Sequence, residues 1–223
     1  MKDIFLVTPP FTQLNTPYPA TAYLKGFFNT KEISSYQMDL GIEVILALFN
    51  KESLENIFHF ALEQDSISSE NSQRIYALKA DYLRTVDSVI AFVQGKNQSL
   101  ARQICTDDYL PQASRFDQVN DMETAFGMMG FQDKAKHIAT LYLEDISDFI
   151  IECIDENFGF SRYAERLGRS ASSFDEMYAK LQEELTYIDE ISLQILDERL
   201  KEVQPKLFCL SVPFPGNLYS AFR

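Results

Sequence analysis

The stretch IFLVTPP, residues 4–10, decides the fold that the sequence predicts. Its first four residues are apolar, and Thr-Pro-Pro then ends the run, which is typical of a short strand leaving a sheet. A loop rich in proline and tyrosine follows, and residues 20–28 then carry apolar side chains at helical spacing. A second strand-like run, residues 35–38, ends at Asp39. This order predicts parallel strands whose carboxyl ends meet at one edge, where ligands bind in open α/β sheets.

A third strand pattern returns only late in the chain, at residues 207–212. A turn rich in proline, residues 213–217, separates it from a final helical pattern. Between the second and third strands the spacing is mostly helical, and the segment is far longer than a crossover between parallel strands needs. We therefore expect a helix-rich α/β fold with a partial parallel sheet of about three strands. The sheet would come from residues 1–41 and 205–223, and residues 42–204 would form a large α-helical insertion.

Apolar stripes at helical spacing locate the helices of the predicted insertion. The expected helices are residues 42–62, 75–93, 122–129, 138–154 and 177–203. The last of them is expected to begin at a capping box, because Ser173 is followed three residues later by Glu176. We expect each stripe to form one continuous helix.

Composition excludes several classes of function. The chain has 33 acidic and 20 basic residues and a formal net charge of -13, so it would repel a phosphate backbone, and no nucleic-acid partner is expected. Three cysteines, Cys105, Cys153 and Cys209, have neither metal-ligand nor secreted-disulfide spacing, and we expect reduced thiols. The sequence has no apolar stretch of membrane-spanning length and no signal-peptide pattern, so we expect no membrane partner and a cytoplasmic location.

The first candidate site is the carboxyl edge of the predicted sheet. The polar and turn residues that follow its three strands are Thr8, Pro9, Pro10, Asp39, Ser211, Pro213 and Gly216. If the strands pair with right-handed connections, these residues fall on one rim. Prolines carry no backbone N–H, so the rim suits a bulky, partly apolar ligand rather than a phosphate. The alternative is that these prolines and glycines only turn the chain into the following helices.

Two further groups of residues have structural explanations. One predicted helix carries four polar candidates, Asp133, His137, Glu144 and Asp148. Asp133 and His137 are four residues apart and could share a metal ion. Carboxylate metal sites normally draw ligands from several helices, however, so we favour a solvated acidic face. The other histidine, His59, has no visible partner and is interpreted as structural.

A second cluster is basic and lies near two glycines, Gly159 and Gly168. Its arginines and the serines that follow them are Arg162, Arg166, Arg169, Ser172 and Ser173. Guanidinium groups and backbone N–H groups at a helix start could hold an anion there, or the arginines could pair with neighbouring carboxylates. The sequence contains no Walker loop, no Gly-x-Gly-x-x-Gly and no Gly-x-Ser-x-Gly motif.

Short motifs at both ends of the chain support a family resemblance. They are FLVTPP at residues 5–10, Tyr18-Pro19, YLKGF at residues 23–27, Asp39, and LSVPFPGN at residues 210–217. Together they resemble the cobalamin-binding domain that precedes the catalytic barrel in many radical SAM enzymes. Residues 135–137 and 158–164 are similar to a helical insertion in one bacterial subgroup of Fe-S oxidoreductases.

The resemblance implies a Rossmann-like sheet of the flavodoxin type with strand order 2-1-3, and a rim that faces a corrin ring. The cofactor-binding residues that it implies are Thr8, Pro9, Pro10, Tyr18, Pro19, Asp39, Ser211, Pro213, Gly216 and Asn217. Cobalamin would bind without a lower histidine ligand, since the Asp-x-His-x-x-Gly motif is absent. The Cys-x-x-x-Cys-x-x-Cys motif is also absent, so SAM, the [4Fe-4S] cluster and the C-terminal radical SAM barrel would belong to the parent protein outside this chain. No catalytic or metal-ligating residue is expected here.

The final helical pattern runs without a cap to Arg223, which predicts an N-terminal fragment of a longer enzyme. The sequence also leaves an alternative function open. The fold could be a cofactor-free vestige whose helical insertion serves as an interaction or oligomerisation module. In the truncated chain, the exposed edge of the partial sheet could also produce a homodimer that has no biological meaning.

Overall fold

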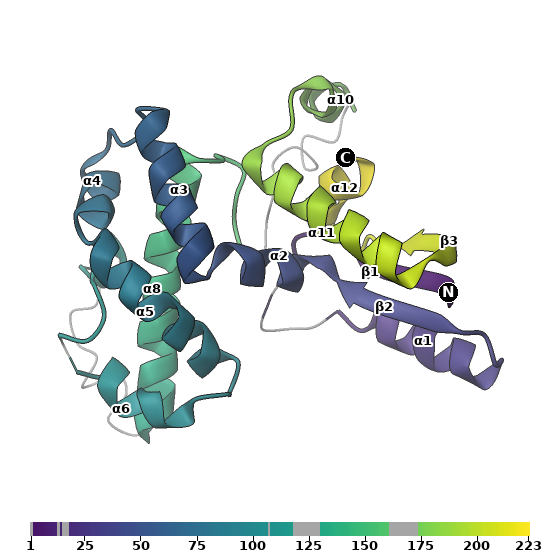
Figure 1. Cartoon of the computed structure of the whole chain (residues 1–223), viewed down its shortest axis with the longest axis horizontal. Coiled ribbons are helices and arrows are strands. Elements are labelled where there is room, and N and C mark those ends of the chain that lie inside the picture. Colours follow the sequence, from purple (N-terminus) through teal and green to yellow (C-terminus); the bar gives the residue numbers. More distant parts are fainter. Residues whose placement is uncertain (1, 13, 15–17, 107, 118–129, 161–173) are drawn as a thin grey trace. The chain divides into compact units, whose positions relative to one another are not determined.

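The structure is a computed structural model that describes residues 2–12, 14, 18–106, 108–117, 130–160 and 174–223 (Figure 1). It divides into two compact units, which we call the sheet unit, Met1–Ala47 with Asn157–Arg223, and the helical unit, Leu48–Glu156. The predicted insertion, residues 42–204, includes the whole helical unit, and its boundaries stay a prediction.

A three-stranded parallel sheet forms the centre of the sheet unit. Its strands are β1 (Lys2–Thr8), β2 (Ser35–Asp39) and β3 (Pro205–Leu210), in the order β2-β1-β3. The register pairs Thr8 with Asp39 and Val7 with Leu210. β1 lies in the middle, and Phe5, Leu6 and Val7 of its apolar run are buried. The predicted α/β fold and strand order are confirmed.

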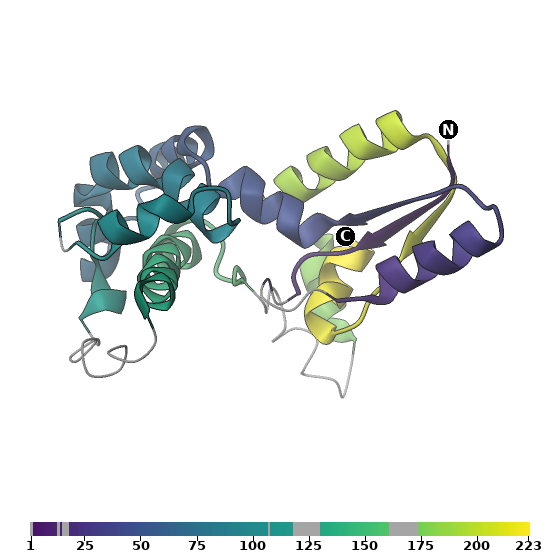
Figure 2. The same cartoon turned by 90° about the horizontal axis from the view of Figure 1, so that it is seen from below.

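Helices cover both faces of this sheet. α1 (Ala20–Thr30) connects β1 to β2 on one face, and α11 (Tyr187–Val203) precedes β3 on the opposite face (Figure 2). A row of aromatic rings crosses the three strands, with Phe5 5.4 Å from Tyr36 and 5.8 Å from Phe208 between ring centroids. The remaining helices described in this unit are α2 (Leu40–Leu48), α10 (Asp175–Gln182) and α12 (Pro215–Phe222). The short strands therefore form the middle layer of an α/β structure, with helices on both sides.

The helical unit is built around the long helix α8 (Gly130–Cys153). Its other helices are α3 (Lys51–Glu63), α4 (Glu70–Ala77), α5 (Lys79–Val93) and α6 (Ala101–Ile104), with 3-10 turns η1 (Gln98–Leu100) and η2 (Ser114–Phe116). Apolar side chains of α3, α5 and α8, such as Leu54, Val86 and Phe149, are fully buried. The apolar stripe predicted for residues 138–154 is confirmed as the inward face of α8.

Three of the predicted helices are each divided into two, and polar caps mark two of these breaks. The stripe at residues 42–62 forms α2 and α3, because the side chain of Asn50 accepts the backbone N–H of Ser53 and starts a new helix. Residues 75–93 divide at Leu78, between α4 and α5. The stripe at residues 177–203 forms α10 and α11, and the capping box that starts α11 consists of Thr186 and Asp189. Residues 122–129 and Ser173 lie outside the described residues.

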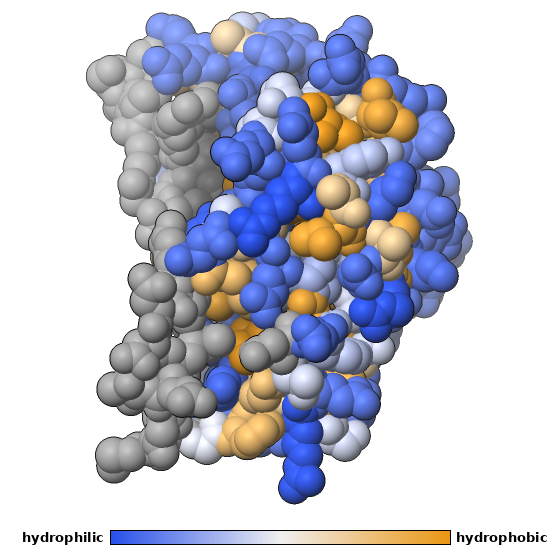
Figure 3. Space-filling model, turned by 90° about the vertical axis from the view of Figure 1, so that its left-hand side faces the viewer, coloured by the Kyte–Doolittle hydropathy of each residue, from blue (hydrophilic) through white to orange (hydrophobic). Residues whose placement is uncertain are grey.

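Among the described helices, none combines the length and the apolar character that a membrane crossing requires. One face of the helical unit is mostly hydrophilic, with hydrophobic side chains interspersed (Figure 3). The three cysteines are free, as the sequence predicts, and only Cys153 is buried.

Candidate functional site

The carboxyl ends of the three strands lie at one level of the sheet. Thr8 is the register partner of Asp39, and the backbone N–H of Ser211 donates a hydrogen bond of 2.8 Å to the carbonyl oxygen of Val7. The chain after β3 therefore continues alongside β1 to the same edge. Three polar residues that the sequence assigned to one rim, Thr8, Asp39 and Ser211, do share that rim.

A buried asparagine connects the segments that follow β1 and β3. The side-chain amide of Asn217 donates a 2.7 Å hydrogen bond to the carbonyl oxygen of Pro9, and Asn217 is fully buried. Its Oδ1 atom has no hydrogen-bond partner among the described residues. Tyr18 and Phe214 come from the same two segments, and their rings form an edge contact at 5.7 Å. The two loops are thus joined where β1 and β3 separate, which is the topological switch point of the sheet.

The predicted rim residues differ in accessibility. Thr8, Pro9, Pro10, Gly216 and Asn217 are buried. Next to the two prolines, Phe11 is also buried, and its ring meets that of Phe158 at 5.7 Å. The rim residues that remain accessible to a ligand, in part or fully, are Tyr18, Pro19, Asp39, Ser211 and Pro213. The start of the first loop therefore supports the rim from inside in this conformation, while the accessible surface comes from the end of that loop and from the segments after β2 and β3.

Asp39 also begins a helix. Its Oδ1 atom accepts the backbone N–H of Ile42 at 3.2 Å, as an N-cap does at the start of α2. Burial raises the pKa of Asp39 above its usual value, and the backbone N–H groups of Ile42 and Gly41 oppose this rise. A Cβ atom at Gly41 would lie 3.3 Å from Asp39 Oδ1, so this close approach favours glycine. The same carboxylate thus serves the helix start and the rim.

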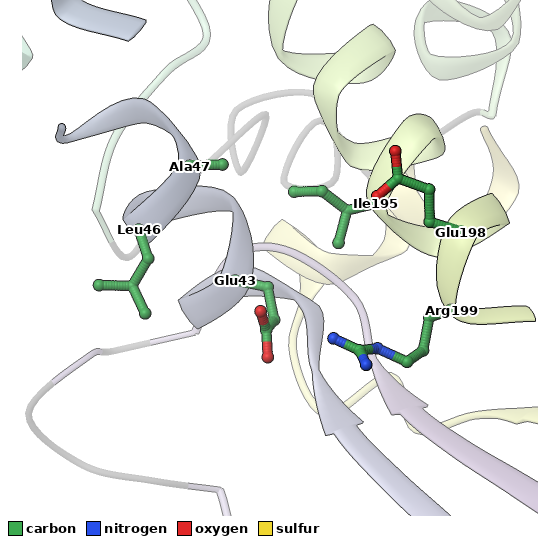
Figure 4. A pocket seen from close by; sticks show the side chains of 6 residues that line it. All are labelled: Glu43, Leu46, Ala47, Ile195, Glu198 and Arg199. Atoms are coloured by element: carbon green, nitrogen blue, oxygen red, sulfur yellow. The ribbon is translucent and has the colours of Figure 1, made fainter. Parts of the chain in front are cut away.

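A groove of about 360 Å³ lies between α2 and α11 within the sheet unit (Figure 4). Its lining residues are Glu43, Leu46, Ala47, Ile195, Glu198 and Arg199. Figure 4 shows the side chains of Glu43 and Arg199 directed toward each other. Arg199 also forms an ion pair of 2.6 Å with Glu202 and lies 5.9 Å from the ring of Tyr36. With two carboxylates and a guanidinium that is already paired, the groove does not suit an anionic ligand.

The three acidic candidates on α8 pair with basic neighbours. Arg115 binds Asp148 through two hydrogen bonds of 2.6 Å and lies 3.8 Å from Glu144, while Lys136 lies 3.8 Å from Asp133. Within the part of the chain that the structure describes, no three potential ligand side chains form a metal-binding group. This geometry favours the charged-face interpretation over a metal site on this helix.

The remaining candidates have different outcomes. His59 has a partner, because its Nδ1 atom lies 3.4 Å from Glu63 on an exposed face of α3. The sequence indicated no partner for His59, and this prediction was wrong. The missed signal is their i, i+4 spacing. The arginine and serine cluster, Arg162, Arg166, Arg169, Ser172 and Ser173, lies outside the described residues, and so does Gly168. The anion site therefore stays a prediction.

The helical unit also holds a buried carboxylate that the sequence did not single out. Asp145 accepts the backbone N–H of Ala113 at 2.9 Å, the backbone N–H of Arg115 at 3.1 Å and the hydroxyl of Tyr82 at 3.2 Å. Burial raises the pKa of Asp145, although these hydrogen bonds oppose the rise. The carboxylate fixes the loop around Ala113 to α8, and we interpret it as a structural anchor.

Comparisons with known proteins give no family. No family model matches the chain, and neither a curated protein nor a solved structure matches it.

Proposed function

We propose that the sheet unit is the cofactor-binding, cobalamin-type portion of a radical SAM Fe-S oxidoreductase or methyltransferase-like enzyme, and that this chain is not catalytic alone. The observation that carries the proposal is the shared rim of Thr8, Asp39 and Ser211 at the switch point of a parallel sheet. The motifs around these three residues are also the ones that resemble the cobalamin-binding domain.

The rim residues fit a flat and largely apolar ligand. Proline and aromatic side chains dominate the segments after β1 and β3, and the accessible polar groups are few, with Asp39 and Ser211 foremost. Both histidines of the sequence, His59 and His137, belong to the helical unit. The sheet unit therefore supplies no imidazole ligand to cobalt. We infer that the ligand is held by its ring edge and side chains rather than by a bond to the metal.

Four rim residues have defined tasks in this proposal. Asn217 holds the Pro9 carbonyl and so fixes the loop after β1 against α12. Ser211 and Asp39 face the ligand as hydrogen-bonding groups, and Tyr18 offers an aromatic edge beside them. When bound, cobalamin would supply methyl-group transfer or electron transfer to a barrel outside this chain. The residues of this chain bind and orient the cofactor.

A second function is favoured by one specific observation. Thr8, Pro9 and Pro10 are buried, so the loop after β1 offers no open shelf in this conformation. This burial favours a cofactor-free fold in which the helical unit mediates interaction with another protein. Among the described residues of the helical unit, the exposed large apolar side chains are Leu62, Val93 and Phe131, which is little apolar surface for docking. We therefore rank the cofactor proposal first.

The test is a titration of the 223-residue chain with hydroxocobalamin. The chain has no tryptophan, so Ser211→Trp both blocks the rim and provides a fluorescent reporter there. The matched control is Ser99→Trp, at an exposed position of the helical unit. The proposal predicts saturable binding by the unsubstituted chain, a loss of affinity of at least about tenfold in S211W, and unchanged affinity in S99W. A folded chain that binds no cobalamin contradicts the proposal.

A further inference from the structure

The groove between α2 and α11 has apolar walls. They are formed by Leu46 and Ala47 of α2 and by Ile195 of α11, and all three side chains are partly buried. Figure 4 shows the side chain of Ile195 pointing from α11 toward α2. The volume of about 360 Å³ is typical of sites for small ligands, which are mostly apolar and carry a few polar groups. The groove can therefore accommodate a small ligand with an apolar portion.

The charges of the groove select a cation. Glu43 and Glu198 line it, and the guanidinium of Arg199 is already paired at 2.6 Å with a third carboxylate, Glu202. Three carboxylates and one guanidinium give these four residues a formal charge of -2. Glu198 accepts a hydrogen bond of 3.1 Å from the side-chain amide of Gln194, which is neutral and leaves the negative charge in place. A ligand that carries a positive charge would compensate this excess.

Arg199 shows how the groove acts on a positive charge. Burial lowers the pKa of its guanidinium, but Tyr36, Glu202 and Glu43 raise it, and the resulting pKa lies above its usual value. The guanidinium also lies 5.9 Å from the centre of the Tyr36 ring, a contact that favours a cation. The side chain is 28% exposed, so a positive charge is stabilised here although it has lost much of its contact with water.

We propose that this groove binds a linear aliphatic amine. The ammonium group pairs with the carboxylates of Glu43 and Glu198, and the methylene chain packs against the apolar walls. An ammonium group is a compact charge with three donors, and a methylene stem covers apolar surface, so this ligand matches both features of the groove. A metal ion would match only the charge. The proposal uses none of the rim residues and is therefore independent of the cobalamin proposal.

The same chemistry occurs in free polyamines and in the lysine side chain of another protein. Isothermal titration calorimetry of the 223-residue chain with putrescine and with N-acetyl-lysine amide, at constant ionic strength, tests the proposal and distinguishes these sources. We expect saturable binding of one amine per chain, and the amine that binds more tightly identifies the source. Ammonium chloride has the charge without the stem, and butanol has the stem without the charge. Each should bind at least about tenfold more weakly.

Substitutions locate the bound amine. Glu43→Gln and Glu198→Gln keep the shape of the side chain and remove its charge, so each should lower the affinity at least about fivefold. Glu198 is exposed, so E198Q tests the site without disturbing the core. The matched control is Glu190→Gln, which removes an exposed carboxylate from the same helix and should leave the affinity unchanged. Circular dichroism verifies that the variants are folded.

Three results overturn this proposal. The first is a folded chain that binds neither amine with saturation. The second is equal affinity for putrescine, the lysine amide and ammonium chloride, which would show that the apolar walls contribute nothing. The third is unchanged affinity in both E43Q and E198Q, or an equal loss in E190Q, which would show that the amine responds to the net charge of the chain and does not bind in the groove.

Discussion

The side-chain amide of Asn217 donates a hydrogen bond of 2.7 Å to the carbonyl oxygen of Pro9, which lies 208 residues earlier in the chain. This contact joins the first turn of α12 to the loop after β1, where the parallel strands separate. Proline residues on both sides leave few backbone N–H groups in this region, so a side-chain donor takes their place. The two ends of the sequence therefore meet at the proposed cofactor rim.

The first prediction concerns this hydrogen bond. Asn217→Ala leaves the buried Pro9 carbonyl without its donor, so the free energy of unfolding should fall by about 1–3 kcal/mol. Urea unfolding followed by circular dichroism measures the change. Asn29→Ala, on an exposed position of α1, is the control and should change the free energy of unfolding by less than about 0.5 kcal/mol. Equal stability of N217A and the unsubstituted chain would show that the contact does not fix the rim.

A second prediction concerns Arg223, whose side chain is 9% exposed. Its Nε atom donates to Asp189 at 3.0 Å, and its terminal nitrogens donate to the carbonyl oxygens of Leu181, Glu183 and Glu184. Arg223→Ala removes several donors at once from the segment between α10 and α11. We expect the free energy of unfolding to fall by about 2–4 kcal/mol.

The matched control for R223A is Arg84→Ala, which removes an exposed ion pair with Asp81. Exposed pairs contribute little, so this change should cost less than about 1 kcal/mol. Arg223→Lys should recover only part of the loss, because a single ammonium group cannot reproduce the planar set of donors. Equal effects of R223A and R84A in urea unfolding would contradict the assigned role of Arg223.

A third prediction concerns acid stability and Asp3. Hydrogen bonds from Lys206 and Ser34 hold the pKa of Asp3 at about 2, below its usual value of 3.8. The pKa of Asp3 is lower in the folded chain than in the unfolded chain. Asp3 therefore stabilises the fold fully above pH 3.8, and this stabilisation is lost as the pH falls toward 2. Asp3→Asn should therefore flatten the dependence of stability on pH within this window.

Urea unfolding at several acidic pH values measures this dependence. The control is Asp133→Asn, which changes an exposed carboxylate 3.8 Å from Lys136. In this variant the free energy of unfolding should depend on acidic pH as it does in the unsubstituted chain. An unchanged slope in D3N would show that the link between β1 and β3 through Asp3 and Lys206 adds no stability.

Much of the sheet could be predicted from local sequence, because its signals are local. The apolar run before Thr8 and the prolines after it set a strand and its end, and Asp39 marks the end of the second strand. The helix breaks at Asn50 and Thr186 were missed because the apolar stripes continue across them. Capping depends on one side chain and one backbone N–H, and such a contact does not disturb hydrophobic periodicity.

The accessible surface of the site could not be predicted in the same way. Proline spacing indicates where a strand ends but not whether Pro9 and Pro10 face solvent, and in the structure both are buried. The groove between α2 and α11 was missed because Glu43 and Arg199 are distant in the sequence. Asp145 was missed because a carboxylate beside an apolar stripe usually faces water.

We propose that the carboxyl edge of the sheet binds a corrin cofactor. The most direct measurement is an NMR spectrum of the backbone amides of the 15N-labelled chain, recorded as hydroxocobalamin is added. We expect saturable shifts at the amides of Asp39, Gly41 and Ser211, with little change in α3, α5 and α8. The absence of shifts, or shifts confined to the helical unit, would contradict it.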